Sequence, residues 1–263
     1  QRACLHCTTI TDNTKNRVMT KTRINTLCAS ALLLMAISCG KQEGGPAGRV
    51  SFSLATEEEV TDVVTRSSVG SFTTMPQAAD FTVTVTGQDG QPTPVTDLGG
   101  TLSLAAGNYT ARATYGSSTD EGFGKPYFLG ETAFSVNGGS QTSVTIPVKL
   151  GNCLVKMEYS DNFRNYYSDW TFTLRTGQGN SFNFGSDETR AVFIDAYTFT
   201  ISGTLTNQGG KVQTFAAKEY RNLSAATCYT MRFDASNVGG GSITISFNDS
   251  VTDVALGEFD LND

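Results

Sequence analysis

The sequence predicts an all-β protein with two consecutive β-sandwich domains. Glycine, threonine, serine, valine, phenylalanine and tyrosine dominate its composition, and apolar residues alternate with polar ones in short runs that end in glycine- or asparagine-rich turns. Long apolar patterns with the period of a helix are missing. About 225 residues follow Cys39, and an ordinary domain holds about 100 to 150, so we expect one domain over residues 49–150 and another over 151–263.

An apolar run of eleven residues, 27–37, organises the N-terminal part of the chain. It follows a basic stretch that begins at Met19, and this combination is typical of a secretory signal peptide. A membrane-spanning helix needs about 20 apolar residues, so a permanent span is the weaker interpretation. We expect a signal peptide over residues 19–38, and upstream translated sequence or a gene-model artefact over residues 1–18.

The four residues 36–39, AISC, resemble a bacterial lipobox. The resemblance implies that lipoprotein signal peptidase cuts before Cys39 and that the thiol of Cys39 carries diacylglycerol. A buried methylene contributes about 0.8 kcal/mol, so several acyl chains would hold the protein at a membrane essentially irreversibly. An ordinary secretory signal with a chance cysteine is the alternative. Residues 39–48 read as the lipidated cysteine and a flexible glycine-rich tether.

The composition after Cys39 excludes several kinds of function. This part of the chain has 14 lysines and arginines against 24 aspartates and glutamates, a net charge of −10, so we expect no nucleic-acid partner. The sole histidine, His6, precedes it, which excludes catalysis by Ser-His-Asp or Cys-His groups and ordinary zinc sites. No phosphate-binding glycine motif is found. We expect no catalytic residue, no metal and no cofactor; a glycosidase that uses two carboxylates remains open.

Alternating runs predict the strands of the first domain over residues 49–54, 81–85, 102–104, 109–115, 128–136 and 142–150. The segment 56–71, with four acidic residues before Arg66, has only a weak period and is expected to be exposed. The last two strands should form a hairpin, and Pro147 places the second of them at an edge or at a point where it leaves the sheet. The polar loop 116–126 is either a mobile hairpin tip or a binding loop.

The stretch LSLAAGNYTARATY within the first domain resembles the L-x-A-G-x-Y strand-turn-strand motif of transthyretin-like and immunoglobulin-like sandwiches. The resemblance implies that Gly107 takes the tight turn and that Tyr109 enters the core. It indicates an architecture and no activity.

The second domain is predicted to begin with a strand over residues 153–159 and a single helical turn that Ser160 or Asp161 caps. Further strands are expected over residues 171–174, 191–194, 197–205, 212–218, 228–233 and 242–247. An aromatic cluster lies just before them and consists of Phe163, Tyr166, Tyr167 and Trp170. Such a cluster either fills the core or forms a carbohydrate platform, and exposure of these side chains would favour the platform.

Cys153 and Cys228 are the cysteines that remain once Cys39 is acylated. Both fall in expected strands of one domain, and an exported protein meets oxidising conditions that permit a disulfide. A bridge that closes a loop of about 75 residues would stabilise the fold by roughly 4 kcal/mol in the chain-entropy model. Two buried reduced thiols are the equal alternative.

The lipobox, the tether and the motifs LAAGNYTARATYG, GFGKPYFLGETAF and YSDNFRNYYSDW together resemble an uncharacterised lipoprotein family of Bacteroidetes, a domain of unknown function that is distantly similar to fimbrillins. Fimbrillin precursors are lipoproteins with two transthyretin-like sandwiches, cut after an arginine to free a groove for a neighbour's strand. The resemblance implies that Arg66 is a processing site, whereas an ordinary solvated charge is the alternative.

These observations predict a non-enzymatic lipoprotein of the outer membrane or cell surface, related to adhesion or fimbriae. A glycan-binding surface lipoprotein and a carboxylate-based glycoside hydrolase are the alternative functions. The expected partners are the membrane, through the lipid anchor, and other surface proteins or glycans. The sequence leaves open whether the body faces the periplasm or the outside.

Overall fold

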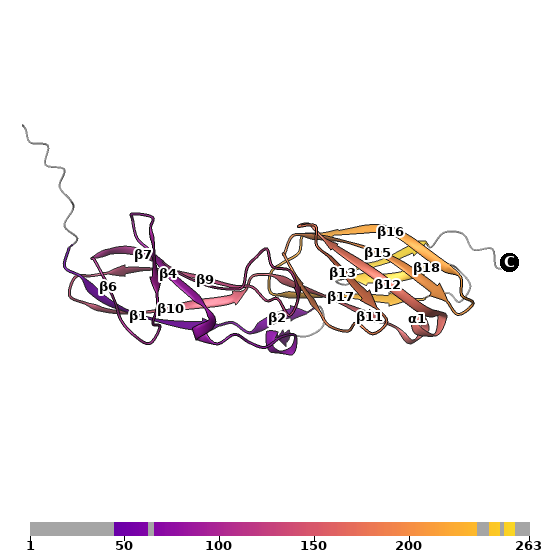
Figure 1. Ribbon diagram of the computed structural model, residues 1–263, viewed down its shortest axis with the longest axis horizontal. Coiled ribbons are helices and arrows are strands. Elements are labelled where there is room, and N and C mark those ends of the chain that lie inside the picture. The colour runs from indigo at the N-terminus through magenta and orange to yellow at the C-terminus, as the bar shows by residue number, and fades with distance from the viewer. Residues whose placement is uncertain (1–44, 63–65, 236–241, 248–249, 256–263) are drawn as a thin grey trace, which may run out of the picture. The chain divides into compact units, whose positions relative to one another are not determined.

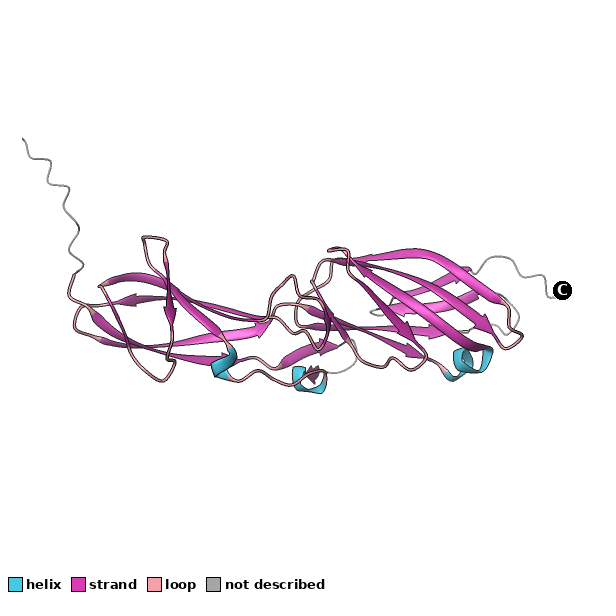
Figure 2. Ribbon diagram, viewed as in Figure 1, coloured by secondary structure: helices cyan, strands magenta, loops and turns pink. Residues whose placement is uncertain are grey.

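The computed structural model describes residues 45–62, 66–235, 242–247 and 250–255 (Figure 1). Almost all regular elements within these ranges are β-strands, which confirms the predicted all-β class (Figure 2). The expected signal peptide and Cys39 lie outside the described residues. No helix in the described ranges is both long enough and apolar enough to cross a membrane.

The first group of strands forms a seven-stranded sheet in the order β5-β4-β7-β9-β10-β1-β6. The strands are β1 (Gly48–Thr56), β4 (Thr82–Thr86), β5 (Pro92–Val95), β6 (Leu102–Leu104), β7 (Gly107–Tyr115), β9 (Phe128–Val136) and β10 (Gln141–Leu150). All the strands expected from alternation in this part of the sequence are present. Strand β5 is additional: it contains two prolines, which suit its place at the edge of the sheet.

Strand β1 lies inside this sheet although it comes first in the chain. It runs parallel to β10 from the pair Arg49–Gln141 to the pair Thr56–Val148, and antiparallel to β6 at its start. Its alternation places Val50 in the core. On its other face, hydroxyl groups of β1 and β10 are hydrogen-bonded in pairs, Ser51 with Ser143 at 3.2 Å and Ser53 with Thr145 at 3.0 Å.

The expected hairpin of β9 and β10 takes a different form. The two strands pair only far from their connecting turn, at Lys149–Leu129 and Leu150–Phe128, because β9 otherwise pairs with β7 and β10 with β1. Strand β10 is therefore not an edge strand. Pro147 lies inside β10, opposite Ala55 of β1 and two positions before the first pair with β9. Since β10 continues in the same sheet to Leu150, the second alternative, a strand that leaves the sheet at Pro147, is also wrong.

The motif around Tyr109 differs in detail from the expectation. Gly107 begins β7 and is not among the described glycines with a left-handed backbone, so it makes no tight turn of that kind. The Tyr109 ring is only half-buried and stacks on Phe134 with a centroid distance of 5.7 Å. Its hydroxyl donates a hydrogen bond of 2.9 Å to the carbonyl of Ala105, which ties the strand to the turn before it.

The second group of strands forms two sheets. One has the order β19-β18-β17-β11-β14-β8, with β2 beside β17 and β3 beside β2; the other has the order β13-β12-β15-β16. Their strands are β2 (Glu59–Asp62), β3 (Arg66–Ser68), β8 (Gly122–Phe123), β11 (Cys153–Tyr159), β12 (Tyr167–Thr176), β13 (Ser181–Gly185), β14 (Val192–Ile194), β15 (Thr198–Asn207), β16 (Val212–Arg221), β17 (Thr227–Asp234), β18 (Ser242–Phe247) and β19 (Ser250–Ala255). Segments that precede residue 151 thus contribute β2, β3 and β8 to a sheet built mainly from later residues.

The described residues form two hydrophobic cores, and β11 takes part in both. Alternate residues of β11, among them Val155 and Met157, pack between the two sheets of the second group, whereas Leu154 packs in the core of the first group. Strand β11 pairs with β17 on one side and with β14 on the other, so it lies inside its sheet. Residues on both of its faces are buried in a core.

The segment 56–71 is not the exposed stretch that its weak period suggested. Val60 on β2 and Val69 in the short 3₁₀-helix η1 (Val69–Ser71) are fully buried in the first core. Strand β2 pairs in parallel with β17 through Thr61 and Thr227, so a partner more than 160 residues away supplies its order. A second 3₁₀-helix, η2 (Ala78–Asp80), leads into β4.

The predicted helical turn is present as α1 (Asp161–Tyr166). Ser160 is its N-cap, and the Ser160 hydroxyl accepts a hydrogen bond of 3.1 Å from the backbone N–H of Phe163. The same hydroxyl donates to the carboxylate of Asp234 on β17. The helix packs inward through Phe163, which is fully buried.

Candidate functional site

Strand β1 and the hairpin of β2 and β3 form the first candidate region. Arg66 is the first residue of β3, and its backbone pairs with Thr61 of β2. Every strand of the seven-stranded sheet except β1 follows Arg66 in the chain. A cut after Arg66 would therefore leave β1 attached to its sheet by non-covalent contacts alone.

The contacts of β1 are those of a core strand. Val50 is fully buried and Phe52 is 4% exposed, and the Phe52 ring meets Phe134 edge-on with a centroid distance of 5.8 Å. Removal of β1 would expose the inward-facing side chains of β10, among them the fully buried Ile146 and Val148. It would also leave the backbone donors and acceptors of β10 along one side without a strand partner, as at a sheet edge.

The two cysteines of the second group lie on neighbouring strands but face different cores. Strands β11 and β17 are parallel, and Cys228 lies opposite Leu154, so these two residues share a face of the sheet. Cys153 precedes Leu154 and packs in the other core. Both cysteines are buried thiols and form no disulfide with each other. Burial raises the pKa of the Cys153 thiol well above its ordinary range, so this thiol is unreactive.

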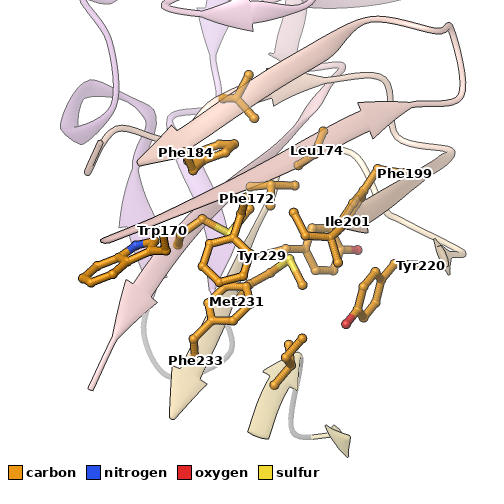
Figure 3. Close-up of a cluster of buried hydrophobic side chains, with 14 of the residues drawn as sticks. Trp170, Phe172, Leu174, Phe184, Phe199, Ile201, Tyr220, Tyr229, Met231 and Phe233 are labelled. Atoms are coloured by element: carbon orange, nitrogen blue, oxygen red, sulfur yellow. The ribbon is translucent and has the colours of Figure 1, made fainter. Parts of the chain in front are cut away.

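The aromatic cluster that suggested a carbohydrate platform fills the second core. Phe163, Tyr167 and Trp170 are at most 4% exposed, and only Tyr166 is half-buried. Trp170 and Phe172 are directed into a layer of side chains from both sheets (Figure 3). The exposure that would favour a platform at these residues is absent, so they act as core residues.

Glu158, one candidate for catalysis by a carboxylate, is engaged in contacts that do not suit a catalytic acid. Glu158 on β11 accepts from Lys156 and from Arg232, each at 3.0 Å, beside a pocket that Asp234 also lines. Partial burial acts to raise the pKa of Glu158, but these two cations outweigh it and the pKa is lowered. A glycosidase acid needs a raised pKa. The described residues also hold no group of three or more potential metal ligands.

The polar loop 116–126 is anchored rather than free at its tip. Glu121 accepts hydrogen bonds from the Thr176 hydroxyl at 2.6 Å, from the Asn180 amide at 2.8 Å and from the backbone N–H of Asp195 at 2.8 Å. The next residues form β8, which pairs with β14. Phe123 of β8 packs edge-on against Phe184, with ring centroids 5.6 Å apart. These contacts argue against a mobile tip, and the role as a binding loop stays a prediction.

Tyr197 marks the second candidate region, which the sequence did not single out. It is 70% exposed and precedes β15, and it lines a pocket of about 320 Å³ together with Glu219, Arg221 and Asn222. Arg221 donates to Glu219 at 2.7 Å, so the pocket contains a paired acid and base. Asn222 has a left-handed backbone with φ of 61°, an unusual conformation for a residue with a side chain.

Several solved structures from Bacteroides and Parabacteroides species are similar to this chain. A candidate cell adhesion protein from Bacteroides eggerthii matches with a TM-score of 0.44 and 11% identity, over 82% of this chain and 98% of its own. A fimbrial assembly protein from Parabacteroides distasonis matches with a TM-score of 0.42 and 10% identity, over 79% and 98%. A candidate cell adhesion protein from Bacteroides thetaiotaomicron matches with a TM-score of 0.41 and 18% identity, over 71% and 92%.

Curated proteins give no significant match to this sequence. The family model described as "Domain of unknown function (DUF4493)" matches residues 46–258, which is most of the chain and includes all the described strands. This match confirms the expected membership in a family of uncharacterised domains. The protein belongs to the DUF4493 family.

Proposed function

We propose that this protein is made as a lipid-anchored precursor and acts as a non-enzymatic component of the outer membrane or cell surface, of an adhesion or fimbria-related type. In this proposal Cys39 carries the lipid, residues 40–47 form the tether, and the sandwiches project from the membrane. Proteolysis after Arg66 releases β1 together with the anchor, and a strand from another subunit takes the place of β1.

The position of β1 is the observation that carries this proposal. A strand that is first in the chain, interior in its sheet and separated from the other strands of that sheet by Arg66 is well placed for exchange. Its vacated position would offer β10 on one side and β6 on the other. An incoming strand would gain main-chain hydrogen bonds from these neighbours, while apolar side chains at alternate positions would fill the sites of Val50 and Phe52.

The chemistry of the available side chains supports a non-enzymatic role. The sequence has no histidine after Cys39, the Cys153 thiol is buried, and Glu158 is held as a carboxylate by two cations. Among the described residues these groups offer no activated nucleophile and no general acid of raised pKa.

Expression in a bacterium that lipidates and exports the chain tests the proposal. N-terminal sequencing of protein released from the cell surface should give Ser67, and unheated samples should show SDS-resistant ladders on gels. An Arg66→Ala variant should lose both. Arg112→Ala is the matched control, because Arg112 is exposed on β7 after the cleavage point and its removal should leave the ladders intact.

A single species that begins at acylated Cys39, without ladders, would contradict strand exchange and leave a monomeric surface lipoprotein. Ladders that persist in Arg66→Ala would place the assembly elsewhere on the molecule.

A further inference from the structure

The pocket beside Tyr197 has the properties of a ligand site. Tyr197 and Val212 are the two large hydrophobic side chains that stand out as exposed in the described part of the chain. Tyr197 lines a pocket, whereas Val212 lines none of the three pockets compared among the described residues. A tyrosine presents a large rigid ring at a small cost in conformational entropy, which makes it effective in binding sites. An exposed tyrosine that lines a pocket is therefore a stronger indication of a binding site than a single exposed valine.

The backbone that carries Tyr197 is held by hydrogen bonds. A methyl group added at Gly177 would lie 3.3 Å from Cδ1 of Tyr197 and 2.9 Å from Cγ2 of Thr198, so the glycine backbone lies directly against this segment. Gly177 also donates its N–H to the Thr198 carbonyl at 2.9 Å. The Tyr197 N–H donates to the Asp195 carbonyl at 2.8 Å. These contacts fix the backbone that carries Tyr197.

Glu121 supports both segments that hold Tyr197. Its carboxylate binds Thr176, the residue before Gly177, and the N–H of Asp195, two residues before Tyr197. We regard Glu121 as a positioning residue for the pocket, because its half-buried carboxylate ties the turn and the β14–β15 connection together.

The opposite wall of the pocket offers hydrogen-bonding groups that are already fixed. The Arg221 guanidinium donates to one oxygen of Glu219 at 2.7 Å. The Thr198 hydroxyl lies 3.1 Å from the other oxygen and 2.8 Å from the Tyr220 carbonyl oxygen, so these two acceptors share its one hydrogen. Between them in sequence, Tyr220 is buried and points into the core (Figure 3), so alternation places Glu219 and Arg221 on the outer face of β16. Asn222 follows with its left-handed backbone, a conformation that costs energy and often marks functional sites.

We propose that this pocket binds a neutral saccharide, whose pyranose ring stacks on Tyr197 while its hydroxyl groups bond to Glu219, Arg221 and Asn222. Three observations favour this ligand class. A sugar ring has an apolar face for the tyrosine and hydroxyls that both donate and accept. The charge of Arg221 is compensated by Glu219, so the pocket has no excess positive charge for a free anion. The volume of about 320 Å³ is at the lower end for small-ligand pockets. This site does not depend on Cys39 or on cleavage at Arg66.

Titration with a defined panel tests the proposal. The probes are the neutral tetrasaccharides maltotetraose, cellotetraose, xylotetraose and mannotetraose, with tetragalacturonate as the acidic comparison. The full-length protein is kept in a detergent without a sugar headgroup, and binding is measured by calorimetry and by saturation-transfer NMR. At least one neutral probe should bind saturably, and Tyr197→Ala should weaken that binding by about tenfold or more.

Two variants separate stacking from general damage. Tyr197→Phe keeps the ring and should retain binding within about twofold, and Val212→Ala, at the other end of β16, should leave it unchanged. Failure of all neutral probes to bind at about 10 mM would overturn the proposal. So would native-like affinity in Tyr197→Ala, and tighter binding of tetragalacturonate than of any neutral probe would make the assigned ligand class wrong.

Discussion

Single residues show which local features the sequence reveals. The sequence predicts a helical turn capped by Ser160 or Asp161, because capping depends on residues within one turn of each other. Ser160 is the cap, and its hydroxyl accepts from the Phe163 N–H. The roles of Glu121 and Tyr197 were missed. The partners of Glu121 lie 55 to 74 positions further along the chain, and no local pattern identifies them.

Ser160→Ala should destabilise the protein by about 1–2 kcal/mol, because it removes the N-cap of α1 and the hydroxyl that donates to Asp234. Urea unfolding of the two proteins measures the difference. Ser186→Ala is the control: its exposed hydroxyl contacts only the adjacent Asp187 at 3.4 Å, so we expect a change within about 0.5 kcal/mol. Equal effects of the two substitutions would contradict the capping role.

Glu158 should contribute to the pH dependence of stability. Its pKa is lower in the folded state than the ordinary value of 4.5, so its contribution is complete above that value and is lost as the pH falls through the folded pKa. Wild-type protein should lose stability below about pH 4.5, and Glu158→Gln should lose less over the same window. Thermal unfolding between pH 3 and pH 7 measures this, with the exposed Glu57→Gln as control. Parallel curves for wild type and Glu158→Gln would count against the assignment.

Individual strands show where sequence patterns succeed and where they fail. Alternation located β1, β6, β9 and β18 to within two residues at each end, because each buries one face against a core. Strands β2, β3 and β8 were missed. They have two to four residues and lack the apolar alternation that located the equally short β6, and β2 and β8 are ordered by pairing with β17 and β14 far along the chain. The expected β9–β10 hairpin failed for the same reason: partners outside the local pair compete for both strands.

Gly130 tests the close approach of β9 to β10. A methyl group at this position would overlap the Pro147 carbonyl oxygen, so Gly130→Ala should force the strands apart and cost about 1–3 kcal/mol. Gly185→Ala is the matched control in another strand, since its nearest neighbour would be the Trp170 carbonyl oxygen at 3.9 Å. Chemical denaturation compares the two, and a tolerated Gly130→Ala would show that β9 and β10 do not approach as described.

The anchoring of loop 116–126 is tested through hydrogen exchange. Glu121→Ala should release the Asp195 N–H, raise its exchange rate and lower stability by about 1–3 kcal/mol, because a hydrogen-bonded carboxylate is lost. Lys125→Ala removes only an exposed ion pair with Asp120 in the same loop and should leave that exchange unchanged. Unaltered protection of Asp195 in Glu121→Ala would contradict the anchor.

At the scale of the whole molecule, the proposed function depends on two regions, strand β1 and the anchor at Cys39. Strand β1 is described in full, whereas the anchor at Cys39 lies outside the described residues. Replacement of Cys39 by Ala should move the uncleaved precursor from the membrane fraction to the soluble periplasm or the medium, since the acyl chains provide its attachment. Fractionation and incorporation of labelled fatty acid measure this. A variant that still sediments with membranes and still incorporates the label would refute lipidation at Cys39.

The mass and N-terminal residue of the mature protein, purified from intact cells, test the central claim most directly. Cleavage after Arg66 and strand exchange predict a chain that begins at Ser67, without acyl groups and without β1, whose first sheet contains a strand from another subunit. A mature chain that begins at acylated Cys39 and retains residues 48–56 in every molecule would contradict it.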